Sequence, residues 1–596
     1  MRLSRLYTNF PAKFEPIEFE DGLNVVIAEI RLPENQDRDT HNLGKTTLGK
    51  IIDFCLLMKK SKKFFLFEYP EHFEDFVFYV ELKLIDDSYL TLRRSVRDAT
   101  LISFKRHVMS VDFLENDVDD WDHEDVTFDR AKQMLDSMLD LQVAKPWDFR
   151  RGLGYLIRGQ DDYTDIFKLA SFAGAHSQWK PFLAHMLGFN SANVTCFYDQ
   201  EKALSEETLK LKTIELELAG LEGNASKVEG LLQLKRKESE ERAKLLDRFD
   251  FKNADLRKTE SLVDEIDSQI AELNKRRYSL KHSKKKISDT LERDQIVFDP
   301  EKATELFREA NVFFEGQIKK DFEQLIEFNR SITSERLKYL REELKEIKLE
   351  LTNINNRLEE LSSKRSGSLA FLSSTDVFRK FKQLSEDQTR MLSDIATLER
   401  QKEFLARMQV LRNSIRTIGD EKDRFRDEIQ IDVEAKNTDE ESVFSRIRFY
   451  FNDIVNEVID RHALLSVQLN GEDHLEFAGE ILNETGHTTS ASSGNSYKKL
   501  LCIAFDLAVL RARLDQRFSR FAFHDGVFET LDPRKKSKLL KVIRHYTELG
   551  LQLIVTTLDS DLPPSDNDES VFSETEVVLR LHDEGIEGRL FKVPTW

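Results

Sequence analysis

The most constraining feature of this chain is a run of apolar residues at alternating steps of three and four. The run consists of Leu337, Leu340, Leu344, Ile347, Leu351, Ile354, Leu358 and Leu361. This spacing places the apolar side chains along one seam of a helix and is typical of a coiled coil. The pattern resumes between Met391 and Ile415. One such stripe also suits a core helix, but eight consecutive positions favour a coiled coil.

A less regular pattern of the same kind runs from Leu211 to Leu273. The two patterned arms, residues 198–290 and 335–435, flank a Phe-rich segment, residues 291–334. We therefore expect a long antiparallel coiled coil within the chain, with an ascending arm, an apex or hinge-like segment and a descending arm. An unbroken arm would reach on the order of 130 Å. The segment between the arms contains no Cys-x-x-Cys, which excludes a zinc hook there.

A phosphate-binding motif lies near the N-terminus. Residues 23–30 are predicted to form a strand, and an apolar helical pattern begins at Ile51. Between them, the residues expected to contact nucleotide are Asn42, Gly44, Lys45, Thr46 and Thr47. In such a loop the lysine reaches the β- and γ-phosphates and the next hydroxyl holds Mg²⁺; Lys45 and Thr46 fit these roles. The alternative is an ordinary helix N-terminus, because Asp39 replaces the first glycine of the pattern.

Two acidic or amide residues also lie at the ends of predicted elements. Asp525 ends a short apolar strand, where a Mg²⁺–nucleotide site needs a carboxylate. Gln160 follows an apolar stretch and suits a glutamine that senses Mg²⁺ and the γ-phosphate. The alternatives are a turn aspartate and a surface glutamine.

A second anion site is predicted in the C-terminal part of the chain. The turn Ser493-Gly494-Asn495 leads into an apolar helix at residues 500–510. A Ser–Gly turn at a helix N-terminus can bind an anion, or it can serve only as an N-cap.

The order of these motifs resembles the SMC/RecN class of ABC-type ATPases. The resemblance implies an α/β ABC-type ATPase head assembled from an N-terminal lobe, residues 1–197, and a C-terminal lobe, residues 436–596. Ser493, Gly494 and Asn495 resemble the signature motif, Asp525 the Walker B acid, and residues 530–532 part of the D-loop. The stretches 39–47 and 524–529 are most similar to bacterial coiled-coil ATPases of the YydD type and of Lamassu-like anti-phage systems.

The chain departs from the ABC pattern at three positions. Gly526 stands where many members carry a catalytic glutamate, Thr557 stands near a common switch histidine, and Asn495 replaces the second glycine of the signature. Hydrolysis is therefore expected to be slow or conditional, with Glu529 as the candidate base and Asp525 beside it.

The resemblance also implies cofactors and partners. The cofactors are ATP and Mg²⁺, with Thr46, Gln160 and Asp525 around the metal. Two heads are expected to form a homodimer around two ATP molecules. Double-stranded DNA or DNA ends, an effector nuclease and a small accessory subunit are the expected partners in an anti-phage or anti-plasmid defence complex. The alternatives are a nucleotide-gated scaffold that holds an effector inactive with little turnover, and an SMC-like DNA-repair protein.

Composition limits these expectations. Charged residues make up 33% of the chain and the net charge is −19, so any DNA contact must come from local basic patches. The three cysteines are far apart and form no disulfide framework, which indicates a reducing compartment. The N-terminus has no signal-peptide core, and no window of about 18 apolar residues suggests a membrane span. A cytoplasmic location is expected.

Overall fold

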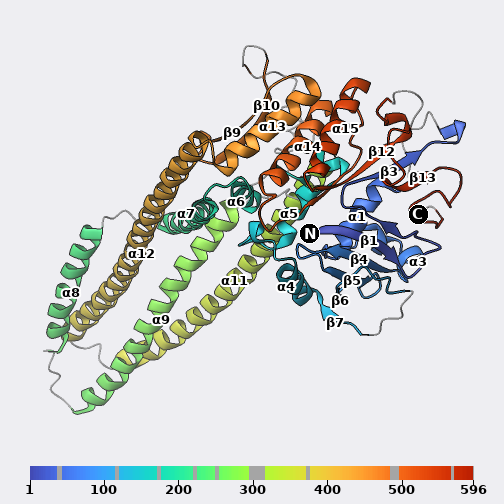
Figure 1. The fold of residues 1–596 in the computed structure, drawn as a ribbon. Coiled ribbons are helices and arrows are strands. Elements are labelled where there is room, and N and C mark those ends of the chain that lie inside the picture. Colours follow the sequence, from blue (N-terminus) through green and yellow to red (C-terminus); the bar gives the residue numbers. More distant parts are fainter. Residues whose placement is uncertain are drawn as a thin grey trace. The chain divides into compact units, whose positions relative to one another are not determined.

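The computed structural model describes residues 1–35, 43–114, 120–170, 176–218, 225–247, 254–293, 316–370, 376–483, 487, 495–564 and 570–594. The chain divides into two compact units. Residues 1–202 and 419–596 form the first, called here the globular unit, and residues 203–418 form the second, called the helical unit. Figure 1 labels most of the helices and strands of both units.

A five-stranded parallel sheet organises the globular unit. Its strands are β3 (Leu23–Glu29), β8 (Ile157–Arg158), β11 (Phe521–His524), β12 (Gln552–Leu558) and β13 (Val577–His582). Their order is β13-β3-β12-β11-β8, and every neighbouring pair is parallel. Strands from the N-terminal and C-terminal parts of the chain are therefore mixed in one sheet. The mixed helix-and-sheet fold expected from the sequence is confirmed.

The apolar sequences of these strands explain the arrangement. All residues of β3 and β12 are buried except the last of each strand. Near-continuous burial of this kind is typical of parallel strands covered on both faces. One hydrophobic cluster joins residues from both chain ends. Neither end could bury this sheet by itself.

A second sheet is antiparallel and comes from the N-terminal part alone. Its strands are β1 (Arg2–Thr8), β2 (Ile17–Glu18), β4 (Val77–Lys83), β5 (Tyr89–Ser95), β6 (Leu101–His107) and β7 (His123–Thr127). Their order is β2-β1-β4-β5-β6-β7. A separate pair consists of β9 (Ala463–Leu469) and β10 (Leu475–Ile481).

Helices surround the two larger sheets. In the globular unit they are α1 (Lys45–Cys55), α2 (Phe65–Glu68), α3 (Pro70–Phe73), α4 (Phe128–Leu139), α5 (Phe149–Leu156), α6 (His176–Met186), α13 (Val443–Ile459), α14 (Asn495–Ala512) and α15 (Pro533–Glu548). Helix α1 contacts β4 and β5 on one side and β8 on the other, so it lies between the two sheets. Helix α15 packs against β3 and β12.

The helical unit contains α8 (Ala225–Asp247), α9 (Ala254–Arg293) and α11 (Gly316–Ala370), together with parts of α7 (Ser191–Leu218) and α12 (Asp376–Thr438). Helices α9 and α11 pack through a cluster that includes Leu280, Ile287, Ile347 and Leu351. Ion pairs join Arg276 to Glu350 and Asp267 to Arg365, so the two helices run antiparallel. Helices α8 and α12 are also antiparallel, with ion pairs Glu229–Lys402 and Arg242–Asp387.

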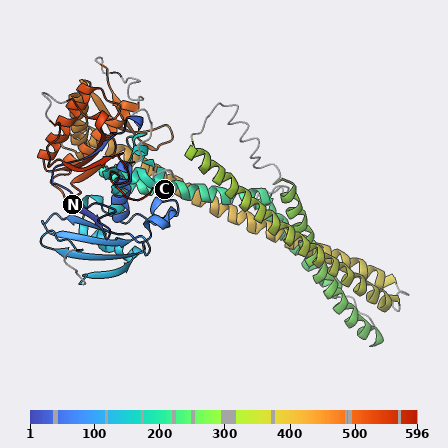
Figure 2. The same ribbon diagram turned by 90° about the vertical axis from the view of Figure 1, so that its right-hand side faces the viewer.

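Both arms are interrupted, and the chain turns back at the interruption between α11 and α12. Arg365 of α11 lies 3.8 Å from Glu386 of α12. Twenty-one residues of continuous helix would separate these positions by about 30 Å. The chain therefore reverses between α11 and α12, and Figure 2 shows the resulting helices side by side. Most of the expected apex, residues 294–315, lies outside the described residues, and a single long antiparallel coiled coil stays a prediction.

Candidate functional site

The loop after β3 brings the lysine and threonine of the predicted motif to the start of α1. Lys45 is the first residue of the helix, and Gly44 is its N-cap with a φ of 109°. A Cβ on residue 44 would also collide with the side chain of Leu590, so this position requires glycine. Asn42 lies outside the described residues.

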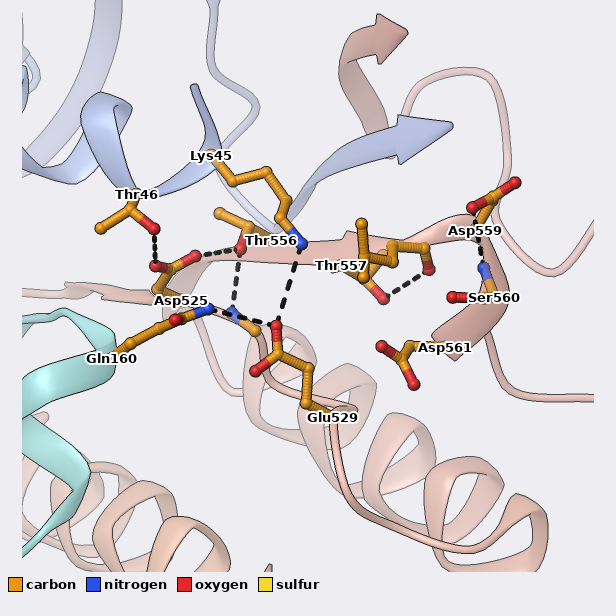
Figure 3. A network of polar contacts seen from close by, with 12 residues as sticks. Lys45, Thr46, Gln160, Asp525, Glu529, Thr556, Thr557, Asp559, Ser560 and Asp561 are labelled. Atoms are coloured by element: carbon orange, nitrogen blue, oxygen red, sulfur yellow. Dashed lines mark hydrogen bonds and ion pairs between the residues drawn. The ribbon is translucent and has the colours of Figure 1, made fainter. Parts of the chain in front are cut away.

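Thr46 and Asp525 meet although 479 residues separate them. The Thr46 hydroxyl donates to Asp525 Oδ2 at 2.5 Å, and the Thr556 hydroxyl donates to Oδ1 of the same carboxylate at 2.5 Å (Figure 3). Strand β12, which carries Thr556, lies between the strands that precede Thr46 and Asp525. Parallel strands place their carboxyl ends at one sheet edge, which is why the three side chains converge.

Glu529 lies beside this group on the turn that follows β11. Its carboxylate accepts a hydrogen bond from Gln160 Nε2 at 3.2 Å and one from Lys499 Nζ at 2.8 Å. Lys45 Nζ is 3.8 Å from the same carboxylate, as Figure 3 shows. Gln160 and Glu529, two residues selected from the sequence, are therefore in direct contact. Two lysines neutralise the charge of Glu529.

Gly526 explains how Glu529 comes so close. Residue 526 has a φ of +66°, and its missing Cβ leaves the space that the Glu529 carboxylate occupies. The amide of Gly526 donates to the Thr556 hydroxyl at 2.9 Å, and its carbonyl accepts from Lys499 at 2.9 Å. Both backbone polar groups of Gly526 are thus hydrogen-bonded, which holds the turn after Asp525.

The site is partly shielded from solvent. Asp525 is fully buried, and the side chain of Lys45 is 9% exposed. Burial lowers the pKa of Lys45, and the nearby Glu529 and Asp525 carboxylates oppose that shift. Lysine ammonium groups held among carboxylates in a shielded site can bind a more highly charged anion if it displaces one of these carboxylates.

An arginine not selected from the sequence positions the segment that carries Gln160. Arg158 is fully buried at the end of β8 and forms a two-bond salt bridge with Asp506 of α14, at 2.7 and 3.0 Å. It also donates to the carbonyl oxygens of Asp162 and Ile166. The sequence places Arg158 and Asp506 within otherwise apolar stretches. Because charged residues are seldom buried unless they are paired, this pattern could have indicated the ion pair.

Lys499 and Thr556 are the other site residues that sequence analysis missed. Lys499 lies in the second turn of α14, four residues after Asn495, and its Nζ is 4.9 Å from the ring centre of Tyr163. Thr556 is a hydroxyl residue at the end of a buried strand. Polar residues at a helix start and at a strand end were the available signals, but neither indicates a partner by itself.

The remaining predicted residues are less informative. Thr47 lies on α1 with no part in the contacts around Asp525 and Glu529. Ser493 and Gly494 lie outside the described residues, and Asn495 is the first residue of α14. Thr557 donates its hydroxyl to the carbonyl of Leu558. In the predicted D-loop, the Asp532 side chain caps α15 by accepting from the Lys535 amide at 3.1 Å.

A cavity of about 940 Å³ opens next to these side chains. Thr46 and Gln160 lie on its wall, and it continues past Asp53, Trp147 and Arg150. Arg150 forms an ion pair with Asp53 at 2.6 Å within this wall. Thr46 and Gln160, two of the converging polar residues, therefore border a space large enough for a small-molecule ligand.

Comparisons with known proteins give a family model and two solved structures of note. Residues 454–595 match the model described as "Uncharacterised protein conserved in bacteria (DUF2326)". No curated protein matches the chain. The Smc head domain with a coiled coil and joint from Pyrococcus yayanosii is 14% identical, with a TM-score of 0.34, and the match covers 93% of this chain and 92% of that one.

The second structure is the Smc head domain with an extended coiled coil, bound to the C-terminal domain of ScpA, from Pyrococcus furiosus. It is 11% identical, with a TM-score of 0.32, over 94% of this chain and 90% of that chain. Such low scores do not by themselves carry functional weight. Among the described helices, none is long and apolar enough to cross a membrane.

Proposed function

We propose that the globular unit binds ATP with Mg²⁺ at the start of α1. The single observation that carries this proposal is the 2.5 Å contact between the Thr46 hydroxyl and the Asp525 carboxylate, directly beside Lys45. A phosphate-loop threonine and a strand-end aspartate that touch form an oxygen pair suited to a hard divalent cation. Gly44 gives the backbone the conformation that the start of α1 requires, and Lys45 supplies a cation for the terminal phosphates.

Mg²⁺, when bound, would neutralise charge on the β- and γ-phosphates. Thr46 and Asp525 would hold it, with Gln160 at its side. Asn42 and Thr47 complete the proposed phosphate contacts from the same loop and helix. Lys45 orients the terminal phosphate, and ATP must compete with Glu529 for this lysine, because the two lie 3.8 Å apart.

Glu529 is the proposed general base for ATP hydrolysis. Its carboxylate lies against Gly526, and Gln160 donates to it at 3.2 Å. Hydrolysis then requires that the attacking water come within hydrogen-bond reach of this carboxylate. Turnover is expected to be slow or conditional, because Gly526 stands where the usual glutamate would be and the base comes instead from Glu529, which Lys499 positions at 2.8 Å.

The wider role rests on the resemblance to SMC/RecN ATPases. Two copies would dimerise through their globular units, with Ser493, Gly494 and Asn495 of one copy facing the ATP of the other. Closure would be transmitted to the helical unit. The proposed context is a cytoplasmic bacterial defence complex with DNA or DNA ends, an effector nuclease and a small accessory subunit.

One observation favours a second candidate, a nucleotide-gated scaffold with little turnover. Both lysines of the site lie within 4 Å of Glu529, so its carboxylate is engaged rather than open to a water. In this reading ATP binding alone releases the restraint on an effector. Steady-state ATPase measurements with and without linear DNA separate the two functions. An SMC-like DNA-repair protein would also hydrolyse ATP in this assay, as the first candidate would.

The nucleotide site is tested by titration calorimetry with Mg²⁺–ATP. We expect Lys45→Ala to abolish binding, because Lys45 is the lysine at the start of α1 that would contact the terminal phosphates. Lys59→Ala is the matched control, since it removes an exposed lysine that follows the same helix and does not line the cavity. Equal ATP affinity in wild type and Lys45→Ala would refute the proposed site.

A further inference from the structure

Helix α9 of the helical unit carries a basic stretch that the proposed nucleotide chemistry does not use. Between residues 275 and 286 there are seven lysines and arginines and no acidic residue: Lys275, Arg276, Arg277, Lys281, Lys284, Lys285 and Lys286. The whole chain has a net charge of −19, so this stretch departs strongly from its background. It covers about 17 Å of helix.

Charges on a coiled-coil helix often only interact with water or with the neighbouring helix. Arg276 serves the second purpose, because it pairs with Glu350 of α11 at 2.8 Å. A second observation concerns Lys275 and Lys286 of the stretch. A cavity of about 290 Å³ lies between α9 and α12, within the helical unit.

The lining of this cavity is cationic and aromatic. Lys275, His282 and Lys286 come from α9, and Arg400 comes from α12. Tyr278 and Phe404 add one ring from each helix, and serine and threonine hydroxyls fill much of the remainder. None of the described residues that line the cavity carries a carboxylate. Such a lining suits a phosphate-bearing ligand with an aromatic part.

The ring of Tyr278 distinguishes between single-stranded and double-stranded nucleic acid as the ligand. This residue is 51% exposed, so its ring is accessible to a ligand. Unpaired bases stack on exposed aromatic side chains while nearby lysines and arginines follow the phosphates. A duplex hides its base faces, so it would use the cations but not the ring.

We propose that the groove between α9 and α12 binds a single-stranded segment of DNA, with a base stacked on Tyr278 and phosphates near Lys275 and Arg400. The inference deepens the DNA part of the proposed function and rests on it. It specifies the form of DNA and the surface that binds it. A frayed or resected DNA end is a source of such a segment.

The test uses the full-length protein and fluorescence anisotropy with a labelled oligothymidylate and a labelled blunt duplex, each over a salt series. The variant Lys275→Glu/Arg400→Glu should weaken oligothymidylate binding by about tenfold or more, and should lower the slope of log affinity against log salt by about 1. Tyr278→Ala should weaken oligothymidylate binding at least ~5-fold and leave duplex binding nearly unchanged.

The matched control is Arg341→Glu/Lys345→Glu, which reverses one arginine and one lysine exposed on α11 near Glu342 and Glu346. It should bind oligothymidylate like the wild type. If the control and Lys275→Glu/Arg400→Glu lose the same affinity for oligothymidylate, the loss comes from the change in net charge. That result would overturn the assignment of the groove. Equal loss of duplex and oligothymidylate binding in Tyr278→Ala would also overturn it.

The outcomes separate this inference from the proposed function. If wild type binds DNA and the groove variants bind it equally well, only the groove is wrong. If wild type binds no DNA of either form, or binds anionic lipid vesicles instead, both the groove and the DNA role fail. ATP titration of each variant in parallel reports whether the globular unit is intact, because none of these substitutions touches the nucleotide site.

Discussion

The carboxylate of Glu529 occupies the space in which a side chain on Gly526 would begin. Many ABC-type ATPases, which this chain resembles, carry a catalytic glutamate at the position of Gly526. Here glycine leaves room, and the turn places the carboxylate of a residue three positions later where the Cβ of residue 526 would be. The chain thus keeps an acid beside Asp525 although the residue that follows Asp525 has no side chain.

Gly526→Ala tests this relationship. The new methyl group would collide with the Glu529 carboxylate, and the φ of +66° is unfavourable for alanine. We expect the free energy of unfolding to fall by about 1–2 kcal/mol. All four tryptophans lie in residues 1–202 or 419–596, so tryptophan fluorescence in urea reports on the globular unit. Gly471→Ala is the control, since no atom lies within 4 Å of its added Cβ.

Glu529→Gln tests the proposed base. The amide keeps the shape of the side chain but cannot accept a proton from water. We expect normal ATP affinity, a loss of turnover of roughly 10²-fold or more, and accumulation of nucleotide-bound dimers. Glu548→Gln, an exposed change at the end of α15, should behave as wild type. Near-normal turnover in Glu529→Gln that still binds ATP would place the base elsewhere.

Lys499→Met tests a positioning role for the lysine that joins α14 to the site. Lys499 contacts Glu529 Oε2 and the carbonyl of Gly526, at 2.8 and 2.9 Å. Without it, kcat should fall while KM for ATP changes little, because Lys45 remains. Lys499→Arg should restore part of kcat. Lys498→Met is the neighbouring control, and a matching loss there would argue for a general effect on α14.

His524 makes the stability of the globular unit sensitive to acid. Burial lowers its pKa to about 3, with smaller contributions from Arg158 and Lys499. Because the ordinary pKa is about 6.5, the unfolded chain binds a proton that the folded chain does not, and stability falls as the pH drops below about 6.5. The loss from this group at pH 5 is about 2 kcal/mol.

Urea unfolding at pH 7 and pH 5 measures that loss. His524→Phe should remove this part of the pH dependence, and His524→Gln serves as a second variant if the larger ring disturbs packing. His545→Phe, an exposed histidine on α15, should leave the dependence unchanged. If wild type and both His524 variants lose the same stability between the two pH values, other groups are responsible.

Leu344→Asp with Leu351→Asp should separate α9 from α11. Leu351 is buried in the seam between them and Leu344 packs against it. A buried seam cannot hold unpaired charge without a large cost. Arg276 Nε and Glu350 Oε1 lie 2.8 Å apart across this seam. Cysteines placed at 276 and 350 should therefore be joined by a bifunctional thiol reagent less efficiently in the double variant than in the unchanged seam. Leu349→Asp changes a side chain that is 66% exposed on the same helix and should leave cross-linking intact.

Several parts of the site were predictable because they depend on neighbours in the sequence. The strand before residue 30, the helix that starts near Gly44, and the short strand before Asp525 all appear as expected. Hydrophobic runs, glycine and strand-end polar residues act over a few residues, so they can be recognised without the fold. The choice of Lys45, Thr46, Gln160, Asp525 and Glu529 as one group came from motif order and resemblance.

Only the tertiary structure decided which of those residues touch. Thr46 meets Asp525 because parallel strands from the N-terminal and C-terminal parts of the chain are mixed in one sheet, and no local pattern encodes that order. Lys499 and Arg158 reach the site through helix and strand packing that sequence spacing does not reveal. The reversal between α11 and α12 was missed for the same reason. A heptad pattern specifies that a helix has a partner, but the partner and the path of the chain depend on which apolar seams can be buried together.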